Sequence, residues 1–115
     1  MNDLKISTKL LGSDVAIVEI AGSLDGHTHP TLEAKLRELL RRGRTKIVAE
    51  LSQLEYISSA GAGVFVGAAG SAREKGGDLI FLGPQPAVRE VFELLGLAQI
   101  FSIAEDRESA LESLT

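Results

Sequence analysis

The chain has 115 residues, an apolar fraction of 44% and a charged fraction of 24%, which are the proportions of an ordinary soluble globular domain. Its formal net charge of −4 argues against nucleic acid or an anionic membrane as a partner, and one Tyr, four Phe and no Trp leave little for stacking on bases. The absence of cysteine excludes disulfides and thiolate catalysis, and no apolar stretch reaches the roughly 20 residues of a membrane span.

Two strands are predicted at the start of the chain. Residues 4–9 alternate apolar and polar side chains and residues 15–20 are rich in β-branched residues, while Gly12 to Asp14 suit a turn between them. Because no crossover helix separates these strands, we expect them to pair antiparallel. Residues 21–30 have the composition of a loop.

A first helix is predicted between Pro30, which suits a first turn, and Gly43, which suits a helix end. Thr28 or Thr31 is expected to cap it. The side of this helix that faces the core is predicted from leucines at helical spacing: Leu32, Leu36, Leu39 and Leu40. Residues 46–51 predict the next strand, in a central position of the sheet.

Helices and strands alternate in the second half of the chain. Helices are predicted over 60–75, from Pro84 or Pro86 to Gly96, and over 105–114; strands are predicted over 78–82 and 100–103. The buried stripe of the middle helix is predicted to be Val88, Val91, Phe92 and Leu95. Single helices between strands indicate parallel neighbours. The sequence therefore predicts one small α/β domain spanning 1–115, with a mostly parallel mixed sheet of four to five strands and about four helices.

The segment YISSAGAG, residues 56–63, places two serines and two glycines where the helix over 60–75 begins. One serine is expected to cap the helix, and the other to be exposed for modification, since a phosphate adds roughly −1.5 to −2 charges where a helix dipole tolerates them. Close packing on the sheet accounts for Gly67 and Gly70. It accounts less well for Gly61 and Gly63, which leave the helix N-terminus open to another molecule.

Other chemistries have weaker support. The spacing G-x-G-x-x-x-G is not a dinucleotide fingerprint, no lysine follows as in a P-loop, and neither serine has the surroundings of a nucleophile elbow. His27 and His29 lack a third metal ligand at useful spacing, and Asp25 alone is weak support, so no metal and no cofactor are expected. A small anion- or nucleotide-binding α/β domain and a constitutive scaffold module stay open as alternatives.

Three segments together resemble the STAS-domain anti-sigma factor antagonist family. The segment LSQLEYISSAGAGVFVG is similar to the family's strand, serine and glycine motif, and GSLDGHTHPTLEAKL is similar to its first loop and helix. The segment REKGGDLIFLGPQPAVREVFELLGLAQIF resembles the family's Gly-Gly strand, the following helix and its ending. The ordered set covers almost the whole chain.

The resemblance implies a cytoplasmic bacterial regulator without catalytic activity. It implies two partners: an anti-sigma factor that is also a Ser kinase, and a metal-dependent Ser/Thr phosphatase that reverses the modification. Ser59 matches the phosphorylated serine and is expected to serve as cap and phosphate acceptor together. The partner-binding residues implied by the resemblance are Asp25, His27, Thr28, Ser58, Ser59, Ala60, Gly61, Ala62 and Gly63.

The chain departs from the family pattern at two acids. Ser58 stands where the family has an Asp before the phosphorylated serine, and Glu50 stands where it has an Asp at the end of the preceding strand. Ser58 is therefore an alternative phosphate acceptor, and an unphosphorylated scaffold remains the second interpretation.

Overall fold

The computed structural model describes residues 3–115. The strands are β1 Lys5–Leu11, β2 Val15–Leu24, β3 Lys46–Glu50, β4 Leu54–Ile57, β5 Asp78–Leu82 and β6 Ile103–Ala104. The helices are α1 His29–Arg41, α2 Ser59–Glu74, α3 Pro86–Leu94, the short 3-10 helix η1 Leu97–Gln99, and α4 Arg107–Glu112. None of these helices combines the length and the apolar composition needed to cross a membrane.

The strands form one mixed sheet in the order β1-β2-β3-β5-β6, and β4 pairs with the end of β2. β1 runs antiparallel to β2, as predicted, and the other pairs are parallel. The sheet therefore has the predicted fold class, with six strands instead of the four to five expected.

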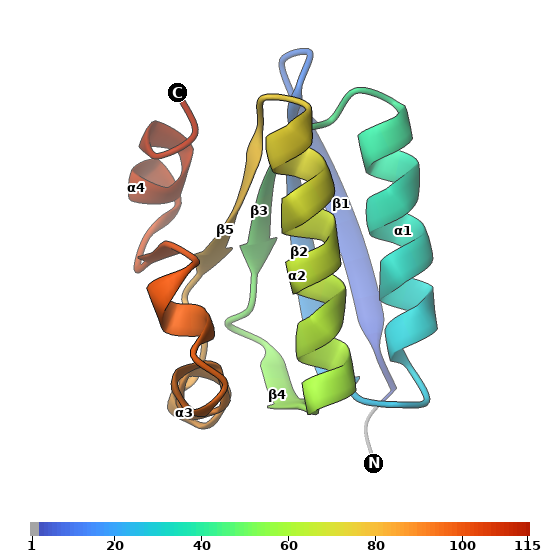
Figure 1. Ribbon diagram of the computed structural model, residues 1–115, viewed down its shortest axis with the longest axis vertical. Coiled ribbons are helices and arrows are strands. Elements are labelled where there is room, and N and C mark those ends of the chain that lie inside the picture. Colours follow the sequence, from blue (N-terminus) through green and yellow to red (C-terminus); the bar gives the residue numbers. More distant parts are fainter. Residues whose placement is uncertain (1–2) are drawn as a thin grey trace.

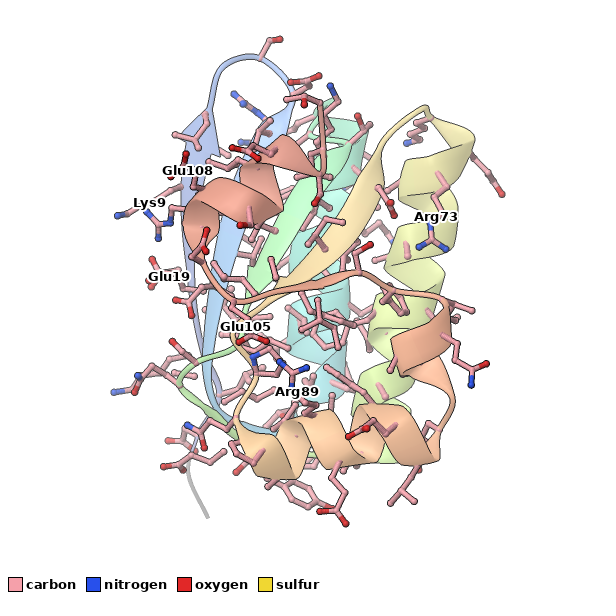
Figure 2. All side chains as sticks on the ribbon, turned by 90° about the vertical axis from the view of Figure 1, so that its left-hand side faces the viewer. Lys9, Glu19, Arg73, Arg89, Glu105 and Glu108 are labelled. Atoms are coloured by element: carbon pink, nitrogen blue, oxygen red, sulfur yellow. The ribbon has the colours of Figure 1, made fainter. Side chains whose placement is uncertain are left out.

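The two faces of the sheet carry different helices. α1 and α2 lie side by side over one face (Figure 1), where their leucines, alanines and Phe65 pack on Val18, Ile47 and Phe81. Figure 2 shows α4 on the opposite side of the sheet from α2, where Ala110 and Leu114 belong to the cluster around Ile17 and Val48. Alternate residues of one strand thus supply both cores, as the pleat requires.

An ion pair connects α3 to the segment just before α4. The guanidinium of Arg89 on α3 donates to the carboxylate of Glu105, just before α4, and Figure 2 shows the two side chains pointing toward each other. Asp106 then caps α4 by accepting a hydrogen bond from the Ser109 N–H at 2.8 Å. Glu108 lies in the first turn of this helix, where an acidic side chain suits the helix dipole.

The predicted loop over 21–30 is wrong at its beginning, because β2 continues to Leu24. Gly22 has a φ of +96°, and the register of β2 shifts between Gly22 and Ser23. This irregularity transfers β2 from pairing with β3 to pairing with β4, and a Cβ at Gly22 would overlap the carbonyl oxygen of Asp3. A glycine in a strand marks such a bulge as readily as it marks a loop.

Three further predictions of elements need correction. β4 was not predicted, because its apolar residues Leu54 and Ile57 are three positions apart and do not alternate. The last strand begins at Ile103 instead of residue 100, and Ile100 is 51% exposed. Leu95 follows the last residue of α3 and is 45% exposed, whereas the rest of the predicted stripe is buried or packs on the core.

Candidate functional site

The loop between β2 and α1 is organised by the side chain of Asp25. Its Oδ1 accepts hydrogen bonds from the N–H of His27 at 2.8 Å and of Thr28 at 3.0 Å. The Thr28 hydroxyl, in turn, donates to the carbonyl of Ser23 at 2.8 Å and accepts from the N–H of Asp25 at 3.0 Å. The loop is therefore a closed turn of side chain-to-backbone bonds, of the kind that Asp favours.

These bonds lower the pKa of Asp25 below its usual value. The N–H of Thr28 has the largest effect and the N–H of His27 the next, because both stabilise the carboxylate form. Asp25 is thus an anion at neutral pH, and the loop presents a fixed negative charge. Thr28 occupies the N-cap position of α1 as predicted, but its hydroxyl makes no capping hydrogen bond because it is directed back to Ser23.

Ser58 is the residue that caps α2. Its backbone is extended, with φ −94° and ψ 169°, and its Oγ accepts a hydrogen bond from the N–H of Gly61 at 3.1 Å. The expectation that Ser59 would be the cap is therefore wrong. Ser59 is the first residue of the helix, and its side chain is exposed, with no hydrogen bond to any other described residue.

Removing this cap should destabilise the protein modestly. We expect Ser58→Ala to lower the free energy of unfolding by about 1 kcal/mol, because the N–H of Gly61 loses its acceptor. Urea unfolding of the two proteins measures the difference. Ser58→Asp is the matched control, since aspartate caps as well as serine does, and it should retain the wild-type stability. Equal stability of Ser58→Ala and wild type would contradict the capping role.

The Asp25 loop and the start of α2 are tied together through Leu24. The N–H of Ser58 donates to the carbonyl oxygen of Leu24 at 2.9 Å, and β4 lies beside the end of β2. A Cβ on Gly61 would lie 2.8 Å from Cγ and 2.9 Å from the carbonyl oxygen of the same leucine. Gly61 is needed for the close approach of the helix to the strand. Nothing in the neighbouring sequence distinguishes a glycine with this packing role from one that leaves a surface open.

The predicted site residues do not all reach the surface. His27, Ser59, Ala60 and Gly63 are exposed, and Asp25, Thr28 and Ser58 are half-buried. Gly61 and Ala62 are buried, so both lie beneath the surface that a partner can touch. Figure 1 shows the loop that precedes α1 and the N-terminus of α2 at the same end of the molecule.

The expected packing role of Gly67 and Gly70 is wrong. Both are exposed, and a Cβ on either would meet nothing within 4 Å. The small residues that do pack on the sheet are the buried alanines of α2: Ala62, Ala68, Ala69 and Ala72.

The two loop histidines do not form a metal centre. His27 is exposed, while His29 is the first residue of α1, with its Nδ1 buried and without a hydrogen bond. Within residues 3–115, no three side chains of the metal-binding types are close enough together to hold an ion. No cofactor site is assigned.

Comparisons with known proteins find relatives that match most of the chain. The chain is 37% identical over 91 residues to BtrV of Bordetella bronchiseptica, which is named a candidate anti-sigma factor antagonist, covering 79% of this chain and 78% of that protein. It is 31% identical over 101 residues to the anti-sigma F factor antagonist of Paenibacillus polymyxa, covering 87% and 86%.

Solved structures share the fold. An anti-sigma factor antagonist from Thermotoga maritima, so named as a candidate, superposes with a TM-score of 0.88 at 25% identity, over 95% of this chain and 93% of that one. The antagonist SpoIIAA in its unphosphorylated form gives a TM-score of 0.84 at 24% identity, over 95% of each chain. The STAS domain family model matches residues 8–110. The chain belongs to the STAS domain family.

Proposed function

We propose that this protein is an anti-sigma factor antagonist, a protein-binding module without catalytic activity that acts in the cytoplasm. It binds an anti-sigma factor, and phosphorylation of Ser59 releases that partner. The proposal is supported by the relatives above, which are named as antagonists, and by the form of the site.

The choice of Ser59 over Ser58 as the phosphate acceptor rests on one observation. The hydroxyl of Ser58 is engaged with the N–H of Gly61 and half-buried, whereas the hydroxyl of Ser59 is exposed one residue later. A kinase that modified Ser58 would have to break the cap of α2 first. Ser59 can accept a phosphate while the helix stays capped.

The switch acts through charge. A phosphate on Ser59 brings roughly −1.5 to −2 charges to the N-terminus of α2, where the helix dipole tolerates them. The same surface already contains the Asp25 carboxylate, which its low pKa keeps ionised. A partner surface that accommodates the neutral hydroxyl must then face two anions, so it dissociates without a change of fold.

The partners follow from the same proposal. The anti-sigma factor is also the Ser kinase that modifies Ser59, and a metal-dependent Ser/Thr phosphatase restores the binding form. Both enzymes need access to the hydroxyl, and its exposure on the first turn of α2 provides that access.

Phosphorylation by the kinase tests the proposal. We expect incubation with ATP and the anti-sigma factor kinase of the same genome to add one phosphate, measured as intact mass. Ser59→Ala should remain unmodified, and Ser58→Asp, which keeps the cap, should still be phosphorylated at Ser59. A wild type that no such kinase modifies would contradict the switch and leave a constitutive scaffold. Full modification of Ser59→Ala, located at Ser58 by peptide mass spectrometry, would contradict the choice of serine.

A further inference from the structure

A groove lies between α1 and α2, away from the Asp25 loop and the cap of α2. Its cavity has a volume of about 240 Å³. The buried side chains of Leu36, Leu40 and Val64 line it, so its floor is apolar. Polar side chains also line the groove: Glu33 and Arg37 of α1 and Ser71 of α2.

Gly67 keeps this groove open, and the fold does not require a glycine there. Gly67 lies inside α2, has no positive φ and would place a Cβ within 4 Å of nothing. A glycine in a helix interior is unfavourable relative to alanine. Packing within the protein does not compensate for this at Gly67, because no other atom lies near its Cβ position. The absent side chain does, however, allow another backbone to approach α2 closely at the groove.

The dimensions of the groove fit a helix better than a small ligand. Its lining residues extend over eight positions on each helix, from Glu33 to Leu40 and from Val64 to Ser71, which corresponds to about 10 Å of helix. Two helices that lie side by side form a groove into which the side chains of a third can pack. Pockets for small molecules are usually larger, about 300–1,000 Å³.

The charges around the Leu40 end of the groove are complementary to an acidic partner. Arg37 is 3.7 Å from Glu33 in an ion pair that is at least half exposed on both sides, so it is weakly held. Arg41 is exposed one turn further along α1. The Nζ of Lys75 donates to the carbonyl oxygen of Leu40 at 3.5 Å, so a third cation lies at this end.

We propose that the groove between α1 and α2 receives an amphipathic helix of the anti-sigma factor, which inserts an apolar side chain above Leu40 and Val64 and offers a carboxylate to Arg37. This inference rests on the proposed function. It extends the docking surface from Ser59 along α2 to a region that phosphorylation does not touch. An apolar anchor in a desolvated pocket is the usual source of affinity in such contacts.

Two leucine substitutions on one helix test the groove. Gly67 lines the groove and Gly70 does not. Both are exposed, and a Cβ added at either would meet no other atom within 4 Å. We expect Gly67→Leu to weaken binding of the purified anti-sigma factor at least tenfold by calorimetry, because the leucine fills the groove. Gly70→Leu should stay within twofold of wild type. Both variants should melt at or above the wild-type temperature, since leucine favours helix more than glycine does.

The charged residues around the groove allow a second, independent test. Arg37→Glu should weaken binding of the anti-sigma factor about tenfold, and this loss of affinity should be smaller at high salt. Arg37→Lys keeps the positive charge, so it should lose less affinity than Arg37→Glu. Insensitivity of the affinity to both Gly67→Leu and Arg37→Glu would overturn the groove assignment and leave the switch at Ser59 intact. A wild type that binds no anti-sigma factor of its genome would instead overturn the proposed function. Sedimentation measures a third outcome. If the wild type self-associates and Gly67→Leu abolishes the self-association, the groove binds a second copy of this chain and the proposal is overturned.

Discussion

Ser59→Glu is expected to weaken binding of the anti-sigma factor by about 100-fold, which corresponds to about 2.7 kcal/mol. The substitution puts a permanent negative charge on the first residue of α2, close in the fold to the Asp25 carboxylate, because the adjoining residues Ser58 and Leu24 are hydrogen-bonded. A charge that is buried at an interface without a partner of opposite sign costs several kcal/mol. The fold should be unaffected, since an acid in the first turn suits the helix dipole. Calorimetric titration of each variant with the purified partner measures the effect.

Ser59→Gln is the matched control for size. It has nearly the shape of glutamate without the charge, so it should retain most of the affinity that Ser59→Glu loses. Equal losses in the two variants would mean that bulk at this position, and not charge, excludes the partner. Wild-type affinity in Ser59→Glu, with an unchanged melting temperature, would contradict the charge-based switch.

The elements with a regular hydrophobic pattern could be predicted from the sequence. The leucines of α1 recur at helical spacing and all four are buried, and β3 and β5 are apolar runs that lie in the middle of the sheet. β4 could not be predicted, because only four residues form it and its two central side chains are exposed. Its position depends on the bulge at Gly22, which is a property of the neighbouring strand.

The site was predictable as a segment but not as a set of contacts. Two serines before a helix indicate a cap without saying which serine makes it, because either hydroxyl could reach an N–H of the first turn. The extended backbone of Ser58 decides the question. The glycines of α2 look alike in the sequence, yet Gly61 faces Leu24 whereas Gly63, Gly67 and Gly70 face open space. That difference depends on the rotation of α2 relative to β2, which no local pattern specifies.

The glycines at positions 61 and 63 should therefore respond oppositely to the same substitution. Gly61→Ala is expected to destabilise the protein by a net ~1–2 kcal/mol. Its Cβ would lie 2.9 Å from the carbonyl oxygen of Leu24 and 2.8 Å from Cγ, so the strand end or the helix must move. Because the movement separates α2 from the Asp25 loop, the affinity for the anti-sigma factor should fall as well. Urea unfolding and calorimetric titration measure the two effects.

Gly63→Ala is the control within the same two turns of helix. Gly63 is exposed, has no positive φ and would place its Cβ near no other atom, so alanine should stabilise the protein by up to about 1 kcal/mol. A stabilisation of the same size in Gly61→Ala would show that α2 and β2 are not in close contact at Leu24. Destabilisation confined to Gly61→Ala would mean that this contact, which joins the Asp25 loop to the serine pair, sets the geometry of the site.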